Sequence, residues 1–157
     1  MWSPCLVRSR TPEGRIDIRL GHPVVDDYLE FAAARCRPNT VLAAGYDLKV
    51  FFSIIEADPV EVTAADVLAF IKAQRSAGHP NVIRLVDGES GLSSRTIQRR
   101  LSSLSSLFSF LVTRGDVAVN PVPRGLSTRR SRQRSGRGVP LICTPRTLPR
   151  VADPAEV

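Results

Sequence analysis

The sequence contains few of the residues on which metal centres and disulfide-bonded folds depend. Its 157 residues include three cysteines and two histidines, with no CxxC pair and no cluster of Cys and His. A disulfide framework and a zinc site are therefore not expected, and neither is any other metal or cofactor. Three widely separated cysteines fit reduced thiols in a cytoplasmic protein.

Long apolar segments are missing as well. No hydrophobic run approaches the roughly 18 residues that a membrane-spanning helix needs. The N-terminal residues, MWSPCLVRSRTPEG, contain no apolar stretch of the kind found in a secretory signal. The sequence therefore predicts no membrane span and no membrane partner.

A set of catalytic residues is also lacking. The two histidines, His22 and His79, fall in predicted loops, and the serines after residue 92 have no histidine nearby in the sequence. The run SGRG at 135–138 lacks the strand-to-helix context of a phosphate-binding loop. We therefore expect no catalysis by this chain alone and no small-molecule substrate.

Acidic residues are almost absent from the second half of the chain. Residues 93–152 hold 12 arginines and a single acid, Asp116, whereas residues 1–92 hold 10 Lys and Arg against 12 Asp and Glu. The net charge of +7 therefore comes from the second half. Such an asymmetry favours a polyanionic partner, most simply nucleic acid. A basic tail that serves only solubility is the alternative interpretation.

Helical periodicity is what the sequence does contain. Four segments have the apolar spacing of amphipathic helices, and the sequence contains almost no segment with the alternation of a strand. The predicted helices span residues 23–35, 40–56, 64–76 and 94–114. Asn39 is the expected N-cap of the second helix, and Thr63 with Asp66 forms the expected capping box of the third. The pattern predicts an all-α fold, built as a four-helix bundle.

The helix 94–114 has the clearest pattern. Its apolar residues recur at steps of four, three, four and three, which places on one stripe Ile97, Leu101, Leu104, Phe108 and Leu111. Arginines and serines occupy the other side, which suits a phosphate backbone, although a solvated face is the alternative. The residues expected to face the core from the other helices are Val24, Tyr28, Phe31 and Ala32; Val41, Ala44, Leu48, Phe51, Phe52 and Ile55; and Val67, Leu68, Phe70 and Ile71.

Four regions are expected along the chain. Residues 1–20 are predicted to be a loose, disordered arm, and residues 21–118 the folded domain. Residues 119–152 contain five prolines and the run TRRSRQRSGRG, which is typical of a flexible basic linker. Residues 153–157, DPAEV, have the acid, proline and acid that begin a helix. We expect these last residues to start a further domain that is missing from the chain.

The predicted second and fourth helices resemble those of a known family. Asn39-Thr40 followed by Asp47-Leu48 and Phe51 is similar to the second helix of the core-binding domain of tyrosine recombinases, a family that includes phage integrases and Xer-type recombinases. The predicted fourth helix and the residues that follow it are similar to the fourth helix of the same domain. The matching residues are LSSRTI at 92–97, Arg100-Leu101, Leu104, Phe108, Leu111, Gly115 and Asn120-Pro121. This resemblance implies a SAM-like four-helix domain that forms half of a clamp around double-stranded DNA.

The resemblance also implies which residues contact DNA. Carried over by position, the expected contacts in the second and fourth helices are Thr40, Arg95, Thr96, Arg99 and Arg100, with Arg37, Asn39, Lys49 and Ser103 as secondary contacts. Thr96 could instead only support the first helical turn. The family's catalytic residues belong to its next domain and would lie beyond Val157, so strand transfer is not expected here. Other recombinase subunits on the same DNA are a further expected partner.

Two other functions remain open from the sequence alone. A helical protein–protein interaction module with a basic tail would use Phe51, Phe52 or Phe108, partly exposed, to hold a partner helix. A complete enzyme of unknown type is opposed by the lack of an acid, base and nucleophile set. Binding to duplex DNA that weakens with salt would favour the recombinase interpretation over the interaction module.

Overall fold

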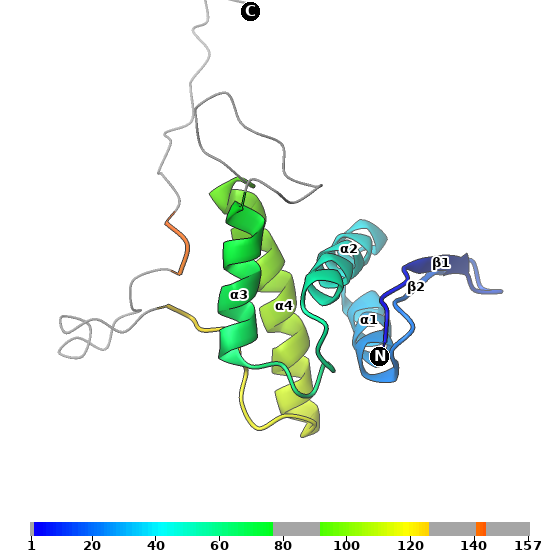
Figure 1. Ribbon diagram of the computed structural model, residues 1–157. Coiled ribbons are helices and arrows are strands. Elements are labelled where there is room, and N and C mark those ends of the chain that lie inside the picture. Colours follow the sequence, from blue (N-terminus) through cyan, green and yellow to red (C-terminus); the bar gives the residue numbers. More distant parts are fainter. Residues whose placement is uncertain (1, 77–91, 126–140, 144–157) are drawn as a thin grey trace, which may run out of the picture.

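The helical prediction is confirmed, with one small sheet added to it. The computed structural model describes residues 2–76, 92–125 and 141–143. Within these ranges it contains four helices and one two-stranded sheet (Figure 1). In chain order the elements are β1 (Val7–Arg10), β2 (Ile16–Arg19), α1 (Pro23–Arg35), α2 (Pro38–Ile54), α3 (Ala64–Arg75) and α4 (Ser94–Arg114).

Side-chain caps mark the starts of α3 and α4. At α3 the Thr63 hydroxyl accepts a hydrogen bond from the Asp66 N–H at 3.4 Å, and the Asp66 carboxylate accepts one from the Thr63 N–H at 2.8 Å. The predicted capping box is thus confirmed. At α4 the Ser93 hydroxyl accepts from the Thr96 N–H at 3.3 Å. The other end of α4 closes at Gly115, whose φ of 89° suits glycine.

The predicted start of α2 is wrong by two residues. The helix begins at Pro38, with Arg37 as its N-cap, rather than at Thr40 with Asn39 as the cap. Proline suits the first helical position because it has no N–H to leave unbonded there and because its φ is already helical. Pro38 therefore starts α2 instead of ending the segment before it.

α4 supplies the centre of the hydrophobic core. All five residues predicted for its apolar stripe are buried, and Leu107 is buried beside them. The stripes predicted for α1 and α3 are partly wrong, because Phe31 and Leu68 are exposed whereas Val25 and Leu29 are buried. α1 packs against β2, α2 and α4. Its buried face is therefore set by three neighbours, which periodicity in a single helix does not reveal.

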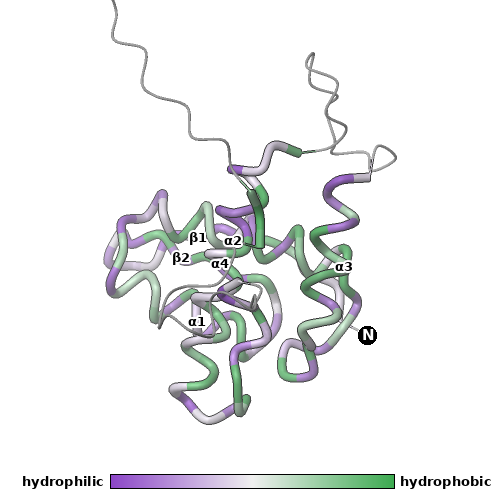
Figure 2. Tube along the Cα trace, turned by 90° about the vertical axis from the view of Figure 1, so that its left-hand side faces the viewer, coloured by the Kyte–Doolittle hydropathy of each residue, from purple (hydrophilic) through white to green (hydrophobic). Residues whose placement is uncertain are grey.

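The prediction of a loose N-terminal arm is wrong for most of residues 1–20. β1 and β2 pair antiparallel, with Val7 opposite Arg19, and form a hairpin that lies beside α1 and α2, on the far side of the domain from α3 (Figures 1 and 2). Ile18 and Leu20 are buried in the core. The apolar residues of IDIRL at 16–20 alternate with polar ones, and this period of two directs one face of β2 inward.

A glycine in α2 lets the hairpin approach closely. A Cβ atom at Gly45 would lie 3.1 Å from a side-chain carbon of Ile18 and 3.1 Å from one of Leu6. Glycine within a helix costs about 1 kcal/mol relative to alanine, so the close packing of the hairpin on α2 is a physical reason for it. The hairpin is therefore part of the packed domain.

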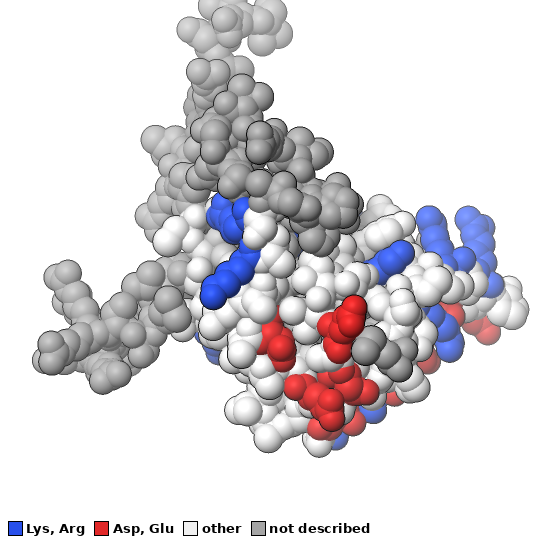
Figure 3. Space-filling model, viewed as in Figure 1, with Lys and Arg blue, Asp and Glu red and all other residues white. Residues whose placement is uncertain are grey.

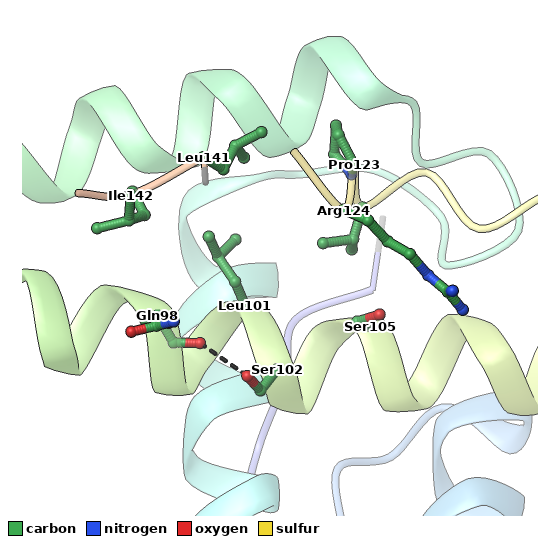
Figure 4. A pocket seen from close by; sticks show the side chains of 9 residues that line it. Gln98, Leu101, Ser102, Ser105, Pro123, Arg124, Leu141 and Ile142 are labelled. Carbon is green, nitrogen blue, oxygen red and sulfur yellow. Dashed lines mark hydrogen bonds between the residues drawn. The ribbon is translucent and has the colours of Figure 1, made fainter. Parts of the chain in front are cut away.

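The packed domain also extends past residue 118. The Asn120 side-chain amide donates to the Ser105 carbonyl at 2.9 Å, and Val122 and Ile142 are buried. In Figure 4, Leu141 and Ile142 lie over Leu101 of α4. These residues are held because their apolar side chains cover α4. The rest of the predicted linker, at 126–140 and 144–152, and the predicted helix start at 153–157 lie outside the described residues.

Candidate nucleic-acid interface

A buried carboxylate joins α2 to α4. The Asp47 side chain on α2 is only 2 % exposed. Arg99 on α4 binds it with both ends of its guanidinium, with Nη1 2.9 Å from Oδ2 and Nη2 2.8 Å from Oδ1. The Ser103 hydroxyl, about one turn further along α4, donates to Oδ2 at 2.8 Å. Charge-assisted hydrogen bonds of this kind are stronger and more directional than neutral ones.

Arg100, the neighbouring residue, points inward and joins α4 to α3. Its side chain is 14 % exposed, and its Nε lies 3.9 Å from Oδ1 of Asp47. Its Nη1 donates to Oε1 of Gln74, a buried residue of α3, at 2.7 Å. Arg100 Nε and Gln74 Nε2 are buried with no hydrogen-bond partner among the described residues. Asp47, Gln74, Arg99, Arg100 and Ser103 together form what we call the polar network.

Burial dominates the electrostatics of the polar network. It raises the pKa of the Asp47 carboxyl above its ordinary value, although the Ser103 hydrogen bond and the guanidiniums of Arg99 and Arg100 act in the opposite direction. Burial likewise lowers the pKa of Arg100, against the effect of Asp47. A buried ion pair is a weak source of stability, because desolvation offsets the attraction. The clearest effect of the network is therefore to orient its side chains.

Four cationic residues gather where α3 ends and α4 begins. Nη2 of Arg75, in the last turn of α3, donates to the Ser94 hydroxyl at 2.6 Å, which holds the two helix ends together. Arg95 is exposed, and the Arg99 side chain is 54 % exposed. Figure 3 shows Lys and Arg at this end of the molecule, while Asp and Glu gather lower on the same face. We call this surface the cationic end: Lys72, Arg75, Arg95 and Arg99.

The start of α2 lies at the same end of the molecule as the start of α4 (Figure 1). Arg37, Asn39 and Thr40 are exposed there. Neither α2 nor α4 has an acidic residue in its first turn. The N-terminus of a helix carries a partial positive charge that acids often neutralise. Both helix starts therefore add to the positive potential of the cationic end.

Comparison with protein families identifies the domain. The family model described as "Phage integrase, N-terminal SAM-like domain" matches residues 25–115, more than half of the 157 residues. The chain belongs to this family. The resemblance to the core-binding domain of tyrosine recombinases is thereby confirmed. No curated protein and no solved structure matches the chain.

The matched SAM-like domain contains the whole polar network and the whole cationic end. It runs from the third residue of α1 to the residue that closes α4. The hairpin of β1 and β2 precedes the match. The features that could meet a ligand at the starts of α2 and α4 therefore lie within the matched residues, and the hairpin lies outside them.

The structure brings some of the predicted contact residues together and separates others. Arg95 and Arg99 lie about one turn apart on α4, within the cationic end, whereas Arg100 and Ser103 are engaged in the polar network. The hydroxyl of Thr96 lies 3.0 Å from that of Ser93, within the helix cap. Lys49 is half-buried further along α2. The exposed cations that remain available to a ligand are therefore fewer than the sequence indicated.

Sequence reasoning missed two members of the polar network, Asp47 and Gln74. Both positions could be recognised in the sequence, because each is a polar residue in line with the apolar stripe of its own helix. Asp47 lies three residues after Ala44 and four before Phe51, and Gln74 lies four after Phe70. A polar residue on an apolar stripe must find a buried partner. That rule predicts a partner without saying which one.

The aromatic residues proposed for a protein-interaction module are not available in the SAM-like domain. Phe51, Phe52 and Phe108 are all buried in the core, so that form of the hypothesis is wrong. The part of the chain that the structure describes also holds no group of three or more His, Cys, Asp and Glu residues able to bind a metal ion. None of the described helices combines the length and the apolar composition of a membrane span.

Proposed function

We propose that this SAM-like domain binds double-stranded DNA within an integrase-type recombination system. The contacts are made by the starts of α2 and α4, through Arg37, Thr40, Arg95 and Arg99. The proposal assigns DNA binding to the domain and no chemical step. Other recombinase subunits on the same DNA are the partners that this role implies.

The observation that carries the proposal is the cationic end itself. Arg95 is exposed and has no hydrogen-bond or ion-pair partner among the described residues, and Arg99 keeps half of its side chain in solvent. The adjoining helix starts carry no acids that would neutralise them. Phosphate groups of a duplex supply the missing negative charge, and helix N-termini are regular phosphate-binding positions.

The salt dependence of binding to duplex DNA tests this proposal. Each phosphate that a cation neutralises contributes about −0.9 to the slope of log affinity against log salt. The variant Arg37→Ala with Arg95→Ala removes from each helix start one exposed arginine that has no ion-pair partner among the described residues, so its slope should be flatter by up to about two units. Fluorescence anisotropy with a labelled duplex, titrated with salt, measures the slope.

A matched control removes the same charge from other parts of the domain. Arg19 pairs with Asp17, and Arg114 pairs with Asp27 and Asp116, so each is already largely neutralised by an acid. The variant Arg19→Ala with Arg114→Ala should therefore keep the original slope. A wild-type chain with no salt-sensitive affinity for duplex DNA would refute the proposed function. Equal flattening in both double variants would refute the assignment of the contacts to the starts of α2 and α4.

A further inference from the structure

We infer that Asp47 is a positioning residue for DNA contact, an inference that rests on the proposed function. Its buried carboxylate holds the guanidinium of Arg99 in place at the surface of α4. The carboxylate is 2 % exposed while the Arg99 side chain is 54 % exposed. The acid is thus withdrawn from solvent, and the cation that it holds is presented to solvent.

The geometry leaves Arg99 able to bind a second anion. A guanidinium has five N–H donors in a rigid fork. Asp47 takes one donor from Nη1 and one from Nη2, at 2.9 and 2.8 Å, and no other partner of Arg99 lies among the described residues. The remaining donors can bind a phosphate without breaking the contact with Asp47. A long arginine side chain also loses conformational freedom when it binds a ligand, and an arginine that is already fixed loses less.

Ser103 also binds the carboxylate of Asp47. Its hydroxyl donates to the same Oδ2 atom that Arg99 Nη1 contacts, at 2.8 Å. The carboxylate therefore has little freedom to rotate, and it holds the guanidinium of Arg99 in one orientation. Asp47 lies on α2 and Arg99 on α4, so this contact also links the two helices whose starts carry the proposed DNA contacts.

A positioning role for Asp47 and simple electrostatics predict opposite effects of removing its charge on the affinity for duplex DNA. Removing a negative charge near a DNA-binding surface should strengthen binding to a polyanion. If Asp47 positions Arg99, Asp47→Asn should instead weaken binding to a duplex at fixed salt by about fivefold, the size typical of coupling between contacting residues. The variant keeps the shape of the side chain and can still accept a hydrogen bond from Ser103.

A double-mutant cycle with Arg99→Ala separates positioning from an effect on the fold. If Asp47 acts through Arg99, Asp47→Asn should change the affinity by less than about twofold when Arg99 is already alanine. Anisotropy with the labelled duplex gives the four affinities, and thermal unfolding confirms that each variant is folded at the assay temperature. If Asp47→Asn is not folded there, Ser103→Ala takes its place in the cycle, with the same expected dependence on Arg99.

Two results would overturn the inference. One is an Asp47→Asn variant that binds duplex DNA as tightly as the wild-type chain, or more tightly. The other is an equal loss of affinity in both backgrounds, which a purely structural role would cause. Nitrogen NMR relaxation of the Arg99 Nε–H group without DNA keeps this inference distinguishable from the proposed function. A rigid group in the wild-type chain and a mobile one in Asp47→Asn supports positioning even if no duplex binds, and equal mobility overturns it.

Discussion

Replacing Leu20, the residue directly after β2, with alanine tests whether the N-terminal hairpin is anchored in the folded domain. Leu20 is 0 % exposed, its N–H donates to the Asp26 carboxylate at 2.6 Å, and its carbonyl accepts from the Trp2 ring N–H at 3.3 Å. Removing a fully buried leucine side chain costs about 2–5 kcal/mol. We expect about 3 kcal/mol, which is a large part of the roughly 5–15 kcal/mol by which a domain of this kind is stable.

Urea denaturation followed by the helical circular dichroism signal measures this loss. The signal reports the helices, so a shifted midpoint shows that the hairpin stabilises them. With a urea slope of about 1.5 kcal/mol per molar, a loss of about 3 kcal/mol lowers the midpoint by about 2 M. Val7→Ala is the control, because Val7 is in β1 and is 54 % exposed. It should change the stability by no more than about 0.5 kcal/mol.

A Leu20→Ala urea midpoint equal to that of the wild-type chain would refute the packing argument and would support the prediction of a loose N-terminal arm. Equal losses for Leu20→Ala and Val7→Ala would also contradict it, because they would indicate an effect of strand sequence and not of burial. The slope should stay unchanged, since a change in slope would indicate a change in the cooperative unit.

Two further predictions concern α2. Gly45→Ala should destabilise the domain by about 1–3 kcal/mol, because the added carbon crowds Ile18 and Leu6. In a background that carries both Leu6→Ala and Ile18→Ala, which removes both close contacts, it should instead be neutral or stabilising by up to about 1 kcal/mol. Urea midpoints of the four chains measure this change of sign, and its absence would contradict the crowding argument. Burial raises the pKa of Asp47, so the folded chain retains this proton to higher pH than the unfolded chain. The stability that Asp47 contributes is present at low pH and is lost as pH rises through the raised pKa. The stability of Asp47→Asn should therefore rise relative to that of the wild-type chain as the pH increases above about 4, the ordinary pKa of an aspartate. A pH-independent difference in urea midpoints would contradict this sign.

Most of the helical framework could be predicted because its causes are local. The capping box of Thr63 and Asp66 and the apolar stripe of the 21-residue helix α4 depend on residues three or four positions apart, so neighbouring residues contain the whole signal. The start of α2 was missed for a local reason too, since Pro38 can either end one segment or begin the next. Only the helix that follows decides between these roles.

The candidate site could be predicted only in part. Arg95 and Arg99 follow from the polar side of α4, which the sequence displays directly. The inward turn of Arg100 does not, because Arg99 and Arg100 are adjacent and only the position of Gln74 on α3 distinguishes them. The same holds for the hairpin, where the alternation at 16–20 is too short to identify a strand until α1 and α2 lie beside it.

The sequence by itself determined the four helices, the buried stripe of α4 and the location of the positive charge, because each depends on spacing along one segment. The tertiary structure decided which cations face solvent. Asp47 and Arg99 are 52 residues apart, and no local pattern encodes a contact over that separation. It arises because packing of α2 on α4 buries a carboxylate that must be satisfied, and Arg99 and Ser103 are the donors that this packing brings to it.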